Sequence, residues 1–264
     1  AQSNAMKILI NSAYGMLGFA GAYFRDVDKA DFVARTGQEI LKAMIRYVEE
    51  GGGRPVICDT DGLMFAGDRE LVDVIQKRLE EDFGGIRIEY EGCYPAVLVH
   101  KKKNYVIQKP DGKVVWKGGF FRSRAYEKFK ANLIHNVALA LLRGDFDEAE
   151  RIIGRTAERI LNGELTAEEV AITTSVNTEG LKNLPHLYAA RRDEVEYDIG
   201  EKVTYYIREM PDVKLYKLKA YEAAFPISAF AGDYHREYYY KRRFLPTARA
   251  LRELIEDAKN AVVD

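Results

Sequence analysis

Cysteine is scarce in this sequence, and long apolar runs are absent. Only two cysteines, Cys58 and Cys93, occur among 264 residues, too few for a disulfide framework or a cysteine-based zinc site. The four histidines are scattered, with no spacing that builds a metal site. No apolar run reaches the roughly 18 residues that a membrane-spanning helix needs. The composition therefore requires neither an oxidising compartment nor a membrane partner.

A large excess of charge is also missing, because the formal net charge is only −1. This balance excludes a protein that is basic over its whole surface, but it does not exclude a local basic patch. Hydrophobic residues make up 47% of the chain, enough for a packed core. We find no internal repeat, and the length suits one large domain or two of ordinary size. Residues 1–5 (AQSNA) are interpreted as an expression-tag remnant, which makes Met6 the natural start.

Residues 54–65 (RPVICDTDGLMF) predict a β-hairpin, because two apolar runs flank a short polar turn that ends in Gly62. Side chains alternate along a strand, so Asp59 and Asp61 can project to the same side of the tip. Two neighbouring carboxylates repel each other unless a cation balances them, and hard oxygen ligands suit Mg²⁺. The hairpin therefore predicts a magnesium site, although Asp and Gly are also ordinary residues of a solvated turn.

Residues 7–19 predict a short helix that ends among glycines. Lys7, Asn11 and Tyr14 are spaced four and three residues apart, which places them on one helical face. A cation, an amide and an aromatic hydroxyl on one face can hold a phosphate and a planar base. The same spacing also fits the solvated stripe of an ordinary amphipathic helix, and the pattern alone does not separate the two.

The segments around the hairpin predict a mixed fold. Residues 28–50 and 69–82 have the apolar spacing of helices, whereas residues 86–90 and 94–100 have the alternating or β-branched pattern of strands. We therefore expect an α+β layer, with helices on one face of an antiparallel sheet.

Residues 101–130 carry a strong positive bias, with ten Lys or Arg against two acids, Asp111 and Glu127. This segment predicts a second hairpin that turns at residues 110–112 (Pro-Asp-Gly). Its basic residues are interleaved with Tyr105, Trp116 and two phenylalanines, as in surfaces that follow a nucleic-acid backbone. A solvated surface would normally mix in more acids, so nucleic acid is the favoured ligand.

The second half of the chain is mostly helical in pattern. Residues 126–143 and 145–161 predict an antiparallel helix pair joined at Gly144. Residues 195–208 predict a hairpin, and residues 233–263 predict two helices broken at Pro246. The tyrosines at 238–240, followed by Lys-Arg-Arg, fit either a core-facing helix or a DNA contact. A domain boundary is expected near Ser123, where strands give way to helices.

Three motifs occur in one order along the chain: residues 7–15 (KILINSAYG), residues 59–61 (DTD) and residues 102–105 (KKNY). They are similar to the fingers-helix motif K-x3-N-S-x-Y-G, the palm hairpin and the K-K-x-Y motif of family B DNA polymerases, of the archaeal and eukaryotic replicative type. The resemblance extends to about residue 251. It implies a partial palm with a fingers-helix remnant, followed by a mostly helical thumb. The expected domains are the tag remnant at residues 1–5, the fingers remnant at 6–25, the partial palm at 26–123 and the thumb at 124–264.

The resemblance also implies roles for single residues. Lys7 would hold the triphosphate of the incoming dNTP with Asn11 beside it, and Tyr14 would pack on the nascent base pair. Asp61 would be a ligand of two catalytic Mg²⁺ ions, with Asp59 a weaker or outer ligand. Such ions, about 4 Å apart, stabilise the attacking and leaving oxygens of phosphoryl transfer. Primer–template DNA would be positioned by a set of basic and aromatic residues: Lys102, Lys103, Tyr105, Lys117 and Arg124.

One motif of the family is absent. The palm sequence D-x-x-S-L-Y-P-S, which supplies the remaining metal-binding aspartate, occurs nowhere in the chain, and neither do the exonuclease and amino-terminal domains. Cys58, Gly62 and Ala125 also depart from the residues of many members. We therefore expect a nucleotidyltransferase subunit that is inactive alone. It would be the small chain of a split DNA-directed DNA polymerase, whose larger partner brings the exonuclease and remaining palm and completes the two-metal site. Apolar surface is expected where that partner docks.

Other interpretations stay open. The segment VICDTDG also resembles the D-x-D-G-T motif of haloacid-dehalogenase-like phosphatases, in which the first Asp is the nucleophile, although Leu63 replaces the Thr. Alternatively, the chain is a catalytically inactive DNA-binding or assembly module derived from a polymerase, or a laboratory fragment of a full polymerase. The polymerase resemblance implies a cytoplasmic, nucleoid-associated protein of an archaeal or other prokaryotic cell.

Overall fold

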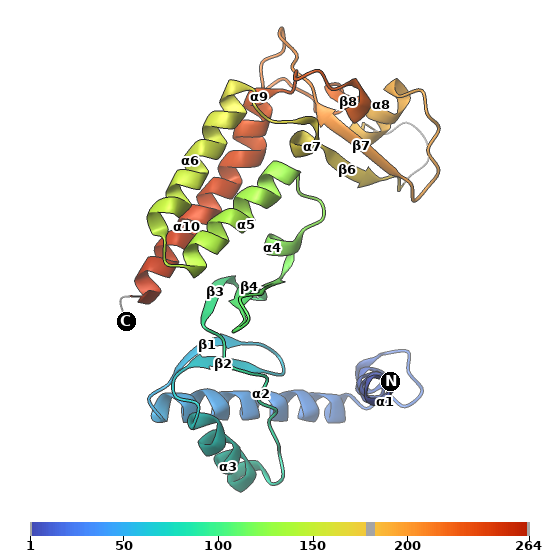
Figure 1. Ribbon diagram of the computed structural model, residues 1–264. Helices are drawn as coiled ribbons and strands as arrows, with labels where there is room; N and C mark the ends of the chain where they lie inside the picture. The colour runs from blue at the N-terminus through green and yellow to red at the C-terminus, as the bar shows by residue number, and fades with distance from the viewer. Residues whose placement is uncertain (1, 178–182, 263–264) are drawn as a thin grey trace. The chain divides into compact units, whose positions relative to one another are not determined.

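The computed structural model of the chain describes residues 2–177 and 183–262. The chain divides into two compact units, Ala1–Cys93 and Tyr94–Asp264, and Figure 1 labels most of their helices and strands. Within the described residues, no helix combines the length and apolar character needed to cross a membrane.

The first unit is built on the long helix α2 (Val27–Glu50). Helix α3 (Leu71–Phe83) and an antiparallel hairpin of β1 (Arg54–Cys58) and β2 (Leu63–Ala66) pack on α2, as Figure 1 shows. Helix α1 (Gln2–Gly18) is almost wholly exposed over residues 5–18 and contacts α2. Asp26 begins α2, because its carboxylate accepts a hydrogen bond from the Lys29 N–H (3.1 Å). The hairpin and the three helices confirm the predictions for this part of the chain.

The core of the first unit lies between α2 and α3. Tyr47 and Val48 of α2 and Leu79 of α3 are fully buried, and Leu63 and Phe65 of the hairpin pack against them. The apolar side chains whose spacing predicted the helices therefore face the hairpin. This packing holds the hairpin, and with it the two candidate aspartates, in place.

The predicted strand at residues 86–90 is wrong. This segment is irregular and is held by one side chain of α3. Gln76 Oε1 accepts a hydrogen bond from the Ile88 N–H (2.8 Å), and Gln76 Nε2 donates to the Ile86 carbonyl (2.9 Å). The amide side chain satisfies backbone groups that a neighbouring strand would otherwise pair.

The second unit begins with a three-stranded antiparallel sheet in the order β3 (Ala96–Lys101), β4 (Asn104–Gln108) and β5 (Val114–Lys117). The turn predicted at residues 110–112 is confirmed, and the Lys109 N–H closes it on the Lys113 carbonyl (2.8 Å). The short helix α4 (Gly119–Arg122) leads to α5 (Lys128–Leu142) and α6 (Phe146–Asn162), which form the predicted antiparallel pair.

A second antiparallel sheet follows, in the order β6 (Ile172–Ser175), β7 (Lys202–Ile207) and β8 (Ala224–Pro226). Helices α7 (Ala167–Val170) and α8 (Pro185–Arg192) and the 3-10 turn η1 (Ile227–Ala229) complete this region. The predicted hairpin at residues 195–208 is wrong, because β7 pairs with β6 and β8, which are distant in sequence. The alternation within residues 195–208 could not reveal these distant partners.

The chain ends in a nearly continuous helical run of α9 (Arg236–Tyr238), the π-type turn η2 (Tyr239–Phe244) and α10 (Leu245–Val262). The predicted break at Pro246 is wrong. A proline removes the helical donor for the carbonyl four residues earlier. Here that carbonyl belongs to Arg242, which lies in the wider π-type turn, and the helix continues through Pro246. Tyr238 and Tyr239 are buried, which favours the core-facing interpretation of the tyrosine run.

One hydrophobic core joins the elements of the second unit. Val137 of α5, Ile153 of α6 and Leu251 of α10 are fully buried in it, as is Tyr206 of β7. The mixed helical and antiparallel structure confirms the predicted α+β class. The first unit ends at Cys93, whereas the predicted palm extends to residue 123. The assignment of fingers, palm and thumb stays a prediction.

Candidate functional site

The two candidate metal ligands lie at the tip of the β1–β2 hairpin. A hydrogen bond from the Asp59 N–H to the Gly62 carbonyl (2.9 Å) closes the turn. Asp59 Oδ1 also accepts from the N–H (2.9 Å) and the hydroxyl (3.3 Å) of Thr60, so this carboxylate helps to hold the turn. Asp61 is exposed, and its carboxylate has no hydrogen-bond or ion-pair partner among the described residues. This arrangement agrees with Asp61 as the main ligand and Asp59 as an outer one, which stays a prediction.

The donor set at the tip fits Mg²⁺ as part of a site. Mg²⁺ is commonly held by one or two carboxylates together with waters and substrate phosphates, and the hairpin offers two carboxylates. In the part of the chain that the structure describes, no group of three or more His, Cys, Asp or Glu residues could hold a metal ion.

The candidate nucleotide-binding residues lie on helix α1. Lys7, Asn11 and Tyr14 are all exposed, and 43% of Tyr14 is accessible to solvent. The helical spacing places the three side chains along one face, as predicted. Both α1 and the hairpin contact α2, so α2 is the element that carries both groups of candidate residues. Their roles in binding remain predictions.

The K-K-x-Y segment forms the turn between β3 and β4. Lys103 has a left-handed backbone, with φ of 62°. Asn104 holds the turn from two sides, since its Nδ2 donates to the Lys102 carbonyl (3.0 Å) and its Oδ1 accepts from the Phe120 N–H (2.9 Å). Gly118 has φ of 84°, and a Cβ there would lie 2.2 Å from the Lys103 carbonyl oxygen. Only glycine fits this position without moving the lysine turn.

The sequence patterns predict no role for Asn104 or Gly118. A polar residue directly after the turn and a glycine directly after a strand were the available signals. Neither signal indicates the distant partner, because Asn104 meets the N–H of Phe120 in α4 and Gly118 approaches the Lys103 carbonyl in the β3–β4 turn.

The candidate DNA-binding residues gather around this sheet. Tyr105 lies opposite Lys117 in the β4–β5 register, and the adjacent turn carries Lys102. Lys102, Lys117 and Arg124 are exposed, and none of them has an acidic partner within residues 2–177 and 183–262. Uncompensated cations next to a tyrosine form a surface that attracts phosphates. Binding of DNA there remains a prediction.

Other basic residues of the 101–130 segment are already engaged. Lys113 forms an ion pair with Asp111 (3.0 Å), and Lys128 forms one with Glu168. Lys130 is half-buried with its ammonium 4.2 Å from the centre of the Tyr126 ring, and burial lowers the pKa of Lys130. The bias in the sequence, ten basic residues against two acids, therefore overstates the positive charge that a ligand meets.

Comparison with known proteins identifies the family. The model for DNA polymerase family B matches residues 1–255. The chain belongs to DNA polymerase family B. It is 27% identical over 270 residues to the DNA polymerase of Thermococcus sp. (strain 9oN-7), a match that covers 95% of this chain and 34% of that polymerase. It is 24% identical over 269 residues to the polymerase of Methanocaldococcus jannaschii, with 95% of this chain and 16% of that protein covered.

A solved structure shows the same fold. The family B DNA polymerase from the hyperthermophilic archaeon Pyrobaculum calidifontis superposes with a TM-score of 0.74 at 24% identity, and the match covers 95% of this chain and 33% of that one. The chain thus spans about a third or less of the length of the family B polymerases it matches here.

These comparisons confirm the predicted polymerase resemblance, and the phosphatase alternative is wrong because the DTD hairpin lies inside the matched polymerase region. The match also includes residues 1–5, and helix α1 begins at Gln2. The interpretation of residues 1–5 as a tag remnant stays a prediction.

Proposed function

We propose that this family B polymerase chain is the small subunit of a split DNA-directed DNA polymerase. The observation that carries the proposal is the family match over residues 1–255, in a sequence that has the DTD hairpin but lacks D-x-x-S-L-Y-P-S. A larger chain supplies the missing palm motif and the exonuclease.

The catalytic contribution of this chain is half of a two-metal site and a nucleotide-binding helix. Asp61 and Asp59 provide carboxylates, and the larger chain provides the others. When bound, the Mg²⁺ pair stabilises the attacking and leaving oxygens of the phosphoryl transfer. Lys7 balances the charge of the dNTP triphosphate with Asn11 beside it, and Tyr14 packs against the nascent base pair.

The second contribution is to hold primer–template DNA. The cations Lys102, Lys117 and Arg124 contact phosphates, and Lys103 and Tyr105 complete the surface around the β3–β4 turn. Phosphate contacts of this kind set the register and orientation of a duplex without reading its sequence.

The exposed apolar surface of the first unit supports docking of the larger chain. Solvent reaches 64% of Leu9 on α1, 94% of Tyr23 in the following loop and 70% of Phe32 on α2. Soluble monomers rarely expose large contiguous apolar patches. The other exposed large apolar side chains of α1, the loop and the start of α2 are Met6, Ile8, Ile10, Tyr14, Met16, Phe19, Phe24, Val27 and Val33. We assign this apolar surface to docking of the proposed larger chain.

Primer extension tests the proposal. The chain is assayed with Mg²⁺ and dNTPs, first alone and then with a second chain that carries the exonuclease and the D-x-x-S-L-Y-P-S motif. We expect extension only in the mixture. Asp61→Ala should lower the rate at least about 100-fold, since even residues that only orient metal ligands are worth 10–100-fold. Asp68→Ala, which removes another exposed carboxylate from the same unit, is the matched control and should leave extension intact.

The outcomes separate the alternatives. Extension by the chain alone at polymerase rates contradicts the need for a partner. Duplex binding without extension, even in the mixture, supports the inactive DNA-binding module instead. Equal losses in Asp61→Ala and Asp68→Ala would show that the hairpin tip has no special role.

A further inference from the structure

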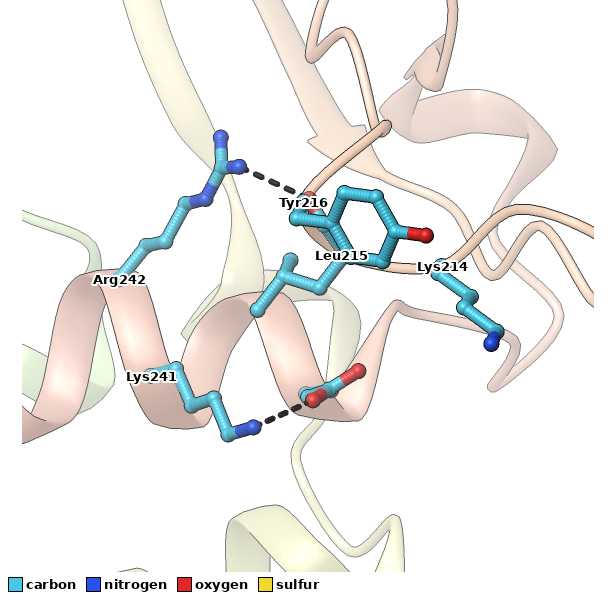
Figure 2. A pocket seen from close by; sticks show the side chains of 6 residues that line it. Lys214, Leu215, Tyr216, Lys241 and Arg242 are labelled. Atoms are coloured by element: carbon cyan, nitrogen blue, oxygen red, sulfur yellow. Dashed lines mark hydrogen bonds and ion pairs between the residues drawn. The ribbon is translucent and has the colours of Figure 1, made fainter.

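A cationic pocket in the second unit is lined by none of the residues assigned above. It has a volume of about 460 Å³ and lies between the loop that precedes β8 and the helical run of α9 and η2 (Figure 2). Pockets of a few hundred Å³ are the usual size for small ligands. Its lining residues are Lys214, Leu215, Tyr216, Glu237, Lys241 and Arg242.

The loop side of the pocket is fixed in place. Arg242 Nη2 donates to the Leu215 carbonyl (2.9 Å), a bond drawn in Figure 2, and the Leu218 N–H donates to the Lys214 carbonyl (3.1 Å). Leu218 is buried, with 5% of its surface accessible. The wall of the pocket is therefore tied both to the helix and to the core, so it is formed before any ligand arrives.

Tyr216 stands out within this fixed loop, because 74% of it is accessible to solvent while Leu218 nearby is buried. Its ring faces the ammonium of Lys217, 5.8 Å from the ring centre. A tyrosine held by an anchored loop but left out of the core is free to stack on a flat ligand.

Positive charge surrounds this ring. Three cations line the pocket, and the single lining acid, Glu237, is paired with Lys241 (2.6 Å). Lys214 and Arg242 are exposed, and neither has an acidic partner in the described part of the chain. The pocket therefore combines two uncompensated cations with one exposed aromatic face, which matches the phosphate and the base of a nucleotide unit.

We propose that this pocket binds an unpaired stretch of nucleic acid, with one base stacked on Tyr216 and the neighbouring phosphates at Lys214 and Arg242. In a duplex the faces of the bases are covered by their neighbours, whereas an unpaired base offers its face to an aromatic side chain. The proposal goes beyond polymerase activity, because binding in this pocket needs neither the hairpin aspartates nor a partner chain.

Fluorescence anisotropy with the full chain and a labelled 12-nucleotide oligo(dT) tests the proposal. Tyr216→Ala should weaken binding roughly 5- to 150-fold, the effect of losing one stacked base, while Tyr216→Phe keeps the ring and should bind nearly as well as the unaltered chain. Lys214→Ala should lower the slope of log affinity against log salt by about 0.7, the effect of one phosphate contact on a single strand. Lys259→Ala is the charge-matched control, because it removes a lysine of the same helical run at a distance from the pocket. Lys259 follows the lining residue Lys241 by 18 residues, about 27 Å along the helix axis.

The results separate this pocket from the proposed duplex surface. Unchanged oligo(dT) binding by Tyr216→Ala, or an equal loss in Tyr216→Phe, overturns the stacking proposal. An equal loss of affinity for a blunt duplex in Tyr216→Ala also overturns it, because no unpaired base is present there. Lys102→Ala tests the duplex surface separately, so failure of either site leaves the other assessable.

Discussion

Replacing Arg243 by methionine tests how strongly a buried ion pair holds the second unit together. Arg243 lies in η2, and its Nε donates to Oε1 of Glu127, the residue at the N-terminal cap of α5. The Glu127 side chain is fully buried, whereas 30% of the Arg243 side chain is accessible. The pair therefore joins the first long helix of this unit to its last helical run, across 116 residues of sequence.

Each partner depends on the other. Burial by itself would lower the pKa of Arg243, but the hydrogen bond to Glu127 and its negative charge raise this pKa overall. Glu127 Oε2 has no hydrogen-bond partner in the described residues. Among these residues, Arg243 is the one cation that forms an ion pair with the buried Glu127 carboxylate. Removing one partner of a buried pair costs about 3–5 kcal/mol. We expect about 3 kcal/mol for Arg243→Met, because the guanidinium is partly solvated.

Urea unfolding followed by tryptophan fluorescence measures this loss. Trp116 is the single tryptophan of the chain and belongs to the second unit, where its ring stacks on His135 with centres 4.3 Å apart. The signal therefore reports unfolding of the unit that contains the ion pair. Arg252→Met is the matched control, because its pair with Glu150 is exposed (57% and 42%) and exposed pairs contribute only about 0–1 kcal/mol.

Two results would refute the reasoning. One is a loss in Arg243→Met that is no larger than in Arg252→Met. The other concerns the double variant Glu127→Leu with Arg243→Met, which removes both charges and should be more stable than Arg243→Met alone. If the double variant loses the sum of both single effects, the two side chains are not coupled.

Three further predictions follow from the site and the core. Gly118→Ala should destabilise the second unit by about 1–3 kcal/mol, the cost of a strained backbone position. It should also weaken duplex binding, because the added Cβ would strike the Lys103 carbonyl. Urea unfolding and fluorescence anisotropy measure the two effects, and unchanged values in both would contradict the tight fit. Lys102→Ala should lower the salt slope of duplex binding by about 0.9, the effect of one phosphate contact, while Lys77→Ala on α3 should not change it. Burial lowers the pKa of His186 from its ordinary 6.5, so the folded state favours the neutral ring. The unfolded chain therefore binds a proton here more readily than the folded chain, and the protein loses stability as the pH falls below 6.5. Urea midpoints at pH 7 and pH 5 should therefore differ by less in His186→Gln than in the unaltered chain, and an equal difference would exclude this histidine as a cause.

Much of the local structure could be predicted because its causes are local. The DTDG turn between two apolar runs specified the β1–β2 hairpin, and the Pro-Asp-Gly turn specified the β4–β5 hairpin. Helices α2, α3, α5 and α6 followed from apolar spacing and from glycines at their ends. The family resemblance came from short motifs whose residues are adjacent in sequence, so they could be recognised without a fold.

The two wrong strand predictions share one physical origin, which is a hydrogen-bonding partner outside the predicted segment. Gln76 satisfies the backbone of residues 86–88 and so replaces a strand partner. The partners of β7 lie outside residues 195–208, as in the Ile172–Tyr205 and Tyr206–Phe225 pairs. No window of local pattern contains such information.

By itself, the sequence determined the two hairpin turns, the main helices, the polymerase motifs and the candidate residues Asp61 and Lys102. Each depends on backbone preferences or side-chain spacing within a few residues. Only the tertiary structure decided that Glu127 pairs with Arg243 inside the core, and that Tyr216 stands exposed beside two uncompensated cations. These features arise where segments distant in sequence exclude water together, so they exist only after the chain has folded.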